Sequence, residues 1–419
     1  MSGKIKLNAA SGGGSVSIQA PSSESNNRTL TLPSDADGTI VSKDTTNNLA
    51  NIASINGGSI GTTNLVINGA MQVAQRGTSS LANGIRTVDR FALNSAGIDG
   101  SPTQAQVDVA SGTTPYTLGF RKAFKATNGN QTSGAGAADA IQMSTRIESQ
   151  DIATSGWNYT SASSFVTFSF WVKSSIAQNF YGYLLTADGT PQQYPFETGT
   201  LSADTWTKIT KTISGNSNLQ FDNNNEVGLK IYISQFLGTD YTDSGVTLNA
   251  WGAYGSGDAR TLDFTSTWYT TNDATFEITG VQLEVSDHAT SFKLEPFQTT
   301  HRKCLRYYQK SYSYGVVPGA TGVNSGMITG SVSDARTNRL DLGTRFETEF
   351  RSNPTMTIYR PLDGAADRLE TYGSGNGTSA TAGRTFTMRG LGRKGFAGFT
   401  LSTSTGGSIG YHYTGESEI

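Results

Sequence analysis

The sequence predicts an all-β protein built from several modules. Only 15% of the 419 residues are charged and 49 are glycine, so charge is scarcer and glycine more frequent than in an average soluble domain. Short segments of alternating apolar and polar residues are separated by Gly, Asn and Asp, which is typical of antiparallel strands joined by turns. One short segment alone has helical periodicity, so antiparallel sandwiches are favoured over an α/β fold.

The composition divides the chain into four regions. We predict an attachment segment over 1–60, a jelly-roll β-sandwich over 61–298, a connecting helix over 299–310 and a C-terminal β-sandwich over 311–419. All five Trp, 17 Tyr and 19 Phe residues follow position 90, so the first region lacks the large apolar side chains of an ordinary core.

The N-terminal region alternates in short segments at 4–7, 16–18, 29–32 and 39–41. Each would have an apolar face only two residues wide, which buries too little surface in a lone chain. We therefore expect neighbouring copies to complete the core, as in an intertwined homo-oligomeric fibre. A disordered linker is the alternative that this polar composition allows.

The jelly-roll region has the clearest strand pattern, and this pattern begins at Ser164. Its core-facing residues are predicted to be Val166, Phe168, Phe170 and Val172. Similar alternation recurs at 227–233 and 276–283. Long strands of this kind, with turn residues between them, predict a sandwich of jelly-roll type.

A short helix is predicted between the two larger modules. Thr299 or Thr300 would cap its N-terminus, and the helix would extend to residue 310. Cys304, Leu305 and Tyr308 would share one face of this connector. Strand patterns return after it at 354–359, 384–388, 399–401 and 409–413.

Composition also excludes several partners. A net charge of −2 argues against a general nucleic-acid binder, although residues 301–419 carry 14 Lys and Arg against 9 Asp and Glu. The single Cys304 excludes a disulfide framework. No apolar run reaches the roughly 18 residues of a membrane helix, so we expect no membrane insertion. The N-terminus has no apolar leader, and we expect synthesis in a cytoplasm.

Motifs for catalysis or metal binding are weak. The GxGxxG match at 390–395 is followed by a strand pattern, so a hairpin loop is favoured over a phosphate site. His301 and Cys304 are three residues apart, but no carboxylate nearby in sequence would orient the imidazole. One Cys and three scattered His residues do not make a zinc site. Calcium could bind carboxylates at 222–226 and 240–243, where solvated turns are the alternative, and we predict no cofactor.

Glycoside cleavage would require two carboxylates held across a cleft. The available residues are Glu148, Glu197, Glu277, Glu284 and Glu295. Most of them lie on or beside predicted strands, and their spacing indicates no pair. We therefore predict a protein that is not an enzyme, with a polysaccharide depolymerase as the alternative.

Aromatic residues in polar loops are more informative. A flat ring flanked by Gly, Asn and Ser can stack on the apolar face of a sugar, while short polar groups bind its hydroxyls. The candidate glycan-binding residues are Trp157, Tyr159, Trp251, Tyr254, Trp268 and Tyr269. For each of them, a place in the sandwich core is the alternative. Trp171 and Trp206 lie within strand patterns and are assigned to the core or its edge.

Several motifs resemble one family. The segments at 9–16, 27–33 and 35–39 are similar to the start of many bacteriophage tail fibre proteins. Asn64–Gly77 and Val88–Phe91 resemble the opening of the carbohydrate-binding-module-like jelly roll that such fibres carry. The resemblance continues through segments at 142–148, 168–173, 278–284, 289–292, 304–310, 351–355 and 413–419.

This resemblance implies a homotrimeric receptor-binding fibre in the virion. The N-terminus would join a tail or baseplate protein, and the distal β domains would bind a host surface polysaccharide or lipopolysaccharide. The family motifs are mainly structural, so they assign no ligand residues to this sequence. A depolymerase tailspike and a purely structural tail or baseplate protein are the alternative functions.

Overall fold

The computed structural model divides the chain into two units, Met1–Ile60 and Gly61–Ile419. The residues that the structure describes are 4–8, 15–19, 54–55, 58–59, 64–255, 259–332, 339–372, 380–401 and 407–419. None of the helices within these ranges is long and apolar enough to span a membrane.

The first unit contains two short antiparallel pairs. Strand β1 (Lys4–Asn8) pairs with β2 (Ser15–Gln19), and β3 (Ser54–Ile55) pairs with β4 (Gly58–Ser59). The strands predicted at 4–7 and 16–18 are thus confirmed. Those predicted at 29–32 and 39–41 lie outside the described residues.

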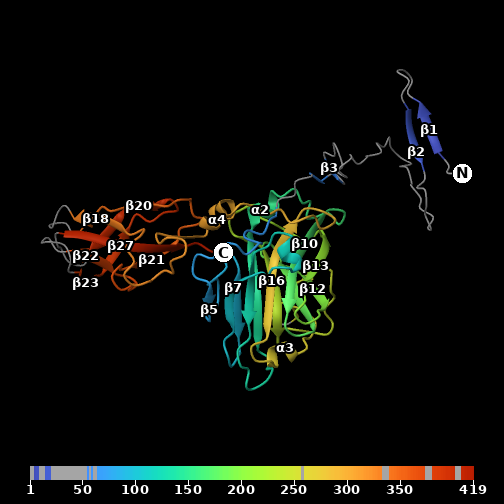
Figure 1. Cartoon of the computed structure of the whole chain (residues 1–419), viewed down its shortest axis with the longest axis horizontal. Helices are drawn as coiled ribbons and strands as arrows, with labels where there is room; N and C mark the ends of the chain where they lie inside the picture. Colours follow the sequence, from blue (N-terminus) through green and yellow to red (C-terminus); the bar gives the residue numbers. More distant parts are fainter. Residues whose placement is uncertain are drawn as a thin grey trace. The chain divides into compact units, whose positions relative to one another are not determined.

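The second unit begins with a sandwich of two six-stranded antiparallel sheets (Figure 1). The first sheet has the order β13 (Thr207–Ser214), β10 (Phe165–Ser174), β16 (Thr275–Glu284), β8 (Lys122–Thr127), β7 (Thr103–Asp108) and β5 (Ser79–Ser80). The second has the order β15 (Gly252–Ala253), β12 (Gln192–Thr200), β11 (Asn179–Thr186), β14 (Val227–Leu237), β9 (Ala140–Glu148) and β6 (Ala92–Ala96). Three short helices lie in its connections: α1 (Thr114–Thr117), α2 (Ser149–Ala153) and α3 (Thr267–Thr270).

Alternation along β10 builds the core between the two sheets. The predicted inward residues Val166, Phe168, Phe170 and Val172 are all fully buried. The ring of Phe168 lies 5.6 Å from that of Phe196 on the opposite sheet. Burying each Phe contributes about 1.5–3 kcal/mol, so this aromatic layer is a main source of the stability of the sandwich.

A helix is present where the connector was predicted, but α4 spans Phe297–Leu305 and not 299–310. The carbonyl of Pro296 accepts the first helical hydrogen bonds, from the amides of Thr299 and Thr300, so these threonines lie inside the helix and do not cap it. The predicted end is also wrong, because Tyr308–Lys310 forms strand β17, which pairs with β27 (Gly407–Glu416). Pairing with the terminal module is stronger than the local helical preference of this segment.

The terminal module is built around β27 (Figure 1). This strand pairs with β17, β18 (Ile328–Val332), β21 (Thr355–Tyr359) and β22 (Leu369–Tyr372), and β22 pairs with β23 (Ala380–Arg384). The other strands are β19 (Arg339–Leu340), β26 (Gly398–Leu401) and β24 (Phe386–Arg389) in one sheet, with β20 (Thr344–Arg345) and β25 (Gly395–Phe396) as a pair. The rings of Phe396, Phe399 and Tyr411 form its core. Gly390 and Gly392 lie in the turn that follows β24, and Gly395 begins β25, so this segment is a loop between strands, as predicted.

A buried ion cluster connects the terminal module to the sandwich. Glu418 contacts Arg90 and lies 3.0 Å from Arg76, and Arg76 lies 3.4 Å from Asp89. Burial opposes ionisation of Glu418, but the attraction of Arg90 and Arg76 outweighs it and lowers the pKa of this carboxyl group. Burial raises the pKa of Asp89, and Arg76 only partly offsets that effect.

A second charged contact lies at the same junction. Glu148, with no exposed surface, accepts hydrogen bonds from Arg306 Nε at 2.7 Å and Nη2 at 2.8 Å, and from Tyr307 Oη at 2.6 Å. Burial opposes ionisation, but these bonds lower the pKa of Glu148. Arg351 donates to the backbone carbonyls of Asn225 and Ser417, which ties both modules to one side chain. Removing Arg306 would leave the buried charge of Glu148 without its partner, which is costly.

Candidate functional site

Three of the six predicted sugar-binding aromatics belong to the sandwich core. Trp157, Trp268 and Tyr269 are 3%, 0% and 1% exposed. The indole of Trp268 donates to the carbonyl of Thr275 at 3.0 Å, and Tyr269 stacks on Phe236 with ring centroids 4.3 Å apart. A ring without an exposed face cannot stack on a sugar, so the prediction is corrected for these three residues. Their burial corresponds to the alternative that the sequence left open.

The burial of Tyr159 is between that of the core aromatics and that of an exposed ring. This residue is half-buried, and its ring packs edge-on against Phe221 at 4.9 Å and against Trp157 at 6.3 Å. This ring stabilises the end of the sandwich and borders none of the cavities described below.

Trp251 and Tyr254 lie in the long connection after β14. Asp243 Oδ1 accepts the amide of Gly245 at 2.6 Å, which forms a tight turn of the kind that Asp favours. Asn249 adopts a left-handed backbone with φ of 58°, and its amide donates to the carbonyl of Pro195 at 2.8 Å. These contacts attach the connection to the edge of β12. Strand β15 then pairs with β12 and extends the second sheet by one strand.

These contacts place Trp251 in a surface groove with a volume of about 280 Å³. The groove is lined by Gln193, Pro195, Asp243, Gly245, Val246, Thr247, Ala250, Trp251, Gly252 and Ala259. The half-buried indole is fixed by a 2.8 Å hydrogen bond to the carbonyl of Ser214 and packs on Tyr194 with centroids 5.4 Å apart. A rigid aromatic ring therefore forms one wall of the groove.

Gln193 supplies a polar group to the same groove. Its Nε2 donates to the carbonyl of Ala259 at 2.6 Å, which fixes the amide. Its Oε1 is buried and has no hydrogen-bond partner among the described residues. A buried acceptor without a partner is costly, so it marks a place where a bound hydroxyl would be stabilised. The exposed carboxylate of Asp243 adds another acceptor.

A row of tyrosines continues from the groove across the outer face of the second sheet. In the strand register, Pro195 lies opposite Tyr183, and Tyr183 lies opposite Tyr232. The two tyrosine rings are stacked, with centroids 4.6 Å apart. Arg260, whose guanidinium carbon lies 4.5 Å from the centroid of the Tyr241 ring, has a buried Nε that none of the described residues satisfies. The sequence pattern could not reveal this row, because it depends on the pairing of three strands.

The carboxylates considered for glycoside cleavage are all engaged. Glu148 is held by Arg306, Glu277 lies 3.1 Å from Lys173, and Glu295 lies 2.5 Å from Lys303. Glu197 accepts a bond from Asn179 at 2.7 Å, and Glu284 accepts one from Gln282 at 2.7 Å. These contacts are structural in character, and they assign no acid or base.

The residues considered for nucleophilic catalysis and for metal binding also have structural roles. Burial raises the pKa of the Cys304 thiol well above its ordinary value, which suits an inert packing residue beside His301. At 222–226, Asn224 Oδ1 accepts the amide of Glu226 at 2.9 Å, as in a turn. No three His, Cys, Asp or Glu side chains within the described ranges gather as a metal site requires.

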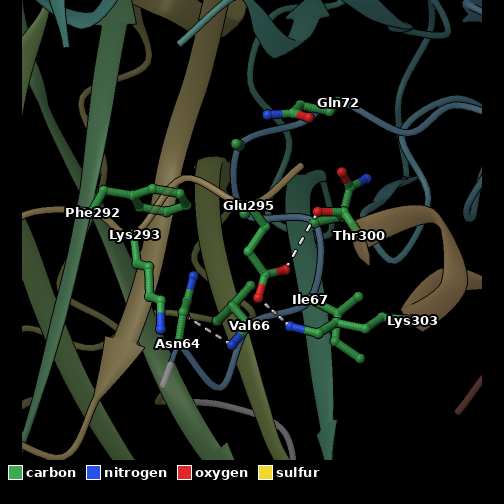
Figure 2. A pocket seen from close by; sticks show the side chains of 12 residues that line it. Asn64, Val66, Ile67, Gln72, Phe292, Lys293, Glu295, Thr300 and Lys303 are labelled. Atoms are coloured by element: carbon green, nitrogen blue, oxygen red, sulfur yellow. Dashed lines mark hydrogen bonds and ion pairs between the residues drawn. The ribbon is translucent and has the colours of Figure 1, made fainter. Parts of the chain in front are cut away.

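A smaller cavity lies beside the first residues of the sandwich, with a volume of about 100 Å³ (Figure 2). Figure 2 shows Glu295 reaching toward Thr300 and Lys303. Asn64 is also engaged, since its Nδ2 donates to the carbonyl of Val281 at 2.9 Å. At about 100 Å³ this cavity is smaller than the Trp251 groove, and its Glu295, Lys303 and Asn64 already have partners, so the Trp251 groove is the better candidate.

No protein-family model matches the chain, and no curated protein matches its sequence. Similar solved structures include carbohydrate-binding modules. A CBM4 module is 15% identical over 52% of this chain and 98% of its own, with a TM-score of 0.25. The N-terminal cellulose-binding domain of Cellulomonas fimi β-1,4-glucanase C is 11% identical over 52% of this chain and 100% of its own, with a TM-score of 0.25.

A bacteriophage protein is also among the similar structures. The enzymatically active domain of tailspike protein 4 of bacteriophage CBA120 is 10% identical over 53% of this chain, with a TM-score of 0.28. The match spans 21% of the length of that tailspike chain. Identities this low assign no residue role to the present chain.

Proposed function

We propose that the sandwich binds a glycan in the groove beside Trp251. The observation that supports this is the combination of a fixed indole wall with the unpartnered Oε1 of Gln193 in one groove. The ring would stack on the apolar face of a sugar, and Gln193 and Asp243 would accept its hydroxyl protons. A groove of about 280 Å³ accommodates one or two sugar rings.

We further propose that the chain is a tail fibre protein that attaches a phage to host surface polysaccharide or lipopolysaccharide. The ordered set of motifs from 9–16 to 413–419 supports this role. The pairing of β1 with β2 supports a shared N-terminal core, because an isolated two-stranded hairpin is marginal in water. In a homotrimer, three weak sites act together, and avidity replaces a single tight site. The N-terminal unit would join a tail or baseplate protein.

We propose that the chain binds the glycan without cleaving it, and the contacts of its carboxylates support this. Glu148, which has no exposed surface, forms a two-pronged contact with Arg306, which leaves it poorly suited to transfer a proton. A depolymerase would release reducing sugar from purified host envelope, and a purely structural tail protein would not bind cells.

The test compares Trp251→Ala with Trp206→Ala in the full chain. Trp206 is a matched control, because it is also part-buried but packs on the outer face of the opposite sheet. We expect Trp251→Ala to weaken binding to host polysaccharide by about tenfold, the effect of about 1.4 kcal/mol of lost stacking. Trp206→Ala should bind as the unchanged protein does. Equal binding by both variants would rule out the Trp251 groove.

A further inference from the structure

The largest of the cavities described lies between helix α4 and the terminal module, with a volume of about 610 Å³. Gln75 of the sandwich, His301 of α4 and Tyr413 of β27 all line it. The cavity therefore requires both modules. It lies apart from the Trp251 groove, with which it shares no residue.

One wall of this junction cavity is rigid. Lys310 Nζ donates to the backbone carbonyls of Gln75 at 2.6 Å, Tyr314 at 2.7 Å and Val316 at 2.6 Å. These three bonds use every donor of the ammonium group, so Lys310 has none left for a ligand. They also hold the loop that carries Tyr314, whose ring lies 5.5 Å from the imidazole of His301. Two flat rings thus stand in fixed positions beside the cavity.

The lining of the cavity also includes two charged side chains. Arg345 and Glu347 are exposed, line the cavity and lie two residues apart. No ion pair engages either side chain within the part of the chain that the structure describes. Burial lowers the pKa of His301, which makes the imidazole neutral near pH 7. Since Lys310 is saturated and His301 is neutral, Arg345 is the guanidinium available to an anion.

We propose that the junction cavity binds an acidic sugar, with its carboxylate on Arg345. The planar guanidinium matches a carboxylate in a two-pronged geometry. Glu347 would accept hydroxyl protons of the same sugar, and the ring of Tyr314, which lines the cavity, would contact its apolar face. A volume of about 610 Å³ accommodates more than one sugar ring. This site is independent of the glycan proposed for the Trp251 groove.

The test measures binding of three acidic probes to the full chain by calorimetry: oligogalacturonate, a hyaluronan oligomer and oligosialic acid. The same oligomers with their carboxyl groups reduced to alcohols serve as neutral counterparts. We expect at least one acidic probe to bind at least tenfold more tightly than its reduced form. Binding should weaken as salt is added, because an exposed ion pair is screened.

Variants separate this site from others. Arg345→Ala should weaken the acidic probe at least tenfold, and Arg345→Lys should recover only part of the loss. Arg302→Ala is the matched control, because Arg302 is an exposed arginine of α4 that does not line the cavity. Trp251→Ala should leave the acidic probe unaffected, so failure of one site is distinguishable from failure of the other. Equal binding of acidic and reduced probes, no binding of any acidic probe, or unchanged binding by Arg345→Ala would overturn the proposal.

Discussion

The guanidinium of Arg90 lies over the ring of Tyr307, with its carbon 3.5 Å from the ring centroid. Arg90 belongs to the sandwich, and Tyr307 follows the helix that leads into the terminal module. A desolvated cation on an aromatic face contributes about 2 kcal/mol. The same arginine contacts Glu418 near the end of the chain, so one side chain connects three distant segments.

Removing the charge of Glu418 should destabilise the junction. Glu418→Gln leaves Arg76 and Arg90 buried without their shared partner, which we expect to cost about 3–5 kcal/mol of unfolding free energy. Chemical denaturation followed by tryptophan fluorescence measures this. Asp108→Asn, which breaks the exposed pair with Lys122, is the control and should change stability little. A loss no larger than that of the control would contradict the assigned role.

The junction should also be sensitive to acid. The pKa values of Glu148 and Glu418 are lowered in the folded chain from 4.5, so their stabilisation is complete above pH 4.5. It is lost as pH falls through the lower, folded-state values. The raised pKa of Asp89 acts in the opposite direction and offsets part of the loss. Thermal unfolding between pH 7 and pH 3 should show a falling Tm, with a shallower fall in Glu148→Gln; a flat profile would contradict this.

Replacing Gln193 should separate binding from stability. Gln193→Leu removes the unpartnered Oε1 together with one hydrogen bond to Ala259, so the two effects on stability should nearly cancel. Glycan binding should weaken about tenfold, because the hydroxyl acceptor is gone. Calorimetric titration and denaturation of the same sample give both values. Normal binding by this variant would remove Gln193 from the site.

The proposed trimer has a mass test. Sedimentation equilibrium of the full chain should give about three times 44.4 kDa. Deleting 1–60 should reduce that mass if the N-terminal unit supplies the shared core. A mass near 44.4 kDa for the full chain would show that the chain is a monomer and that its N-terminal unit shares no core with other copies.

Alternation predicted the strands well, because burial of one face is a local property of the sequence. The pattern from Val166 to Val172 is an example, since both residues are fully buried on β10. Helix boundaries were predicted less well, because Pro296 sets the start of α4 and strand pairing ends it near Tyr308. For Trp268, the sequence left burial in the core as the alternative to sugar binding. Its flanking Ser and Thr residues indicate a loop, whereas the fold places it in the short helix α3 and inside the core.

The contacts between the sandwich and the terminal module could not be predicted from the sequence. Segments that carried the family resemblance, at 64–77, 88–91, 304–310, 351–355 and 413–419, supply residues that make contacts at this junction. The sequence gives no sign of this meeting, because Arg76 and Glu418 are 342 residues apart. Pairing across such a distance depends on tertiary packing, which local periodicity does not encode.

We propose above that this chain attaches to cells through surface glycan. The most direct measurement is binding of the purified full chain to host cells with intact polysaccharide and to the same cells after the polysaccharide is stripped. We expect strong binding to intact cells, at least tenfold weaker binding to stripped cells, and a similar loss for Trp251→Ala on intact cells. Equal binding to intact and stripped cells would contradict it.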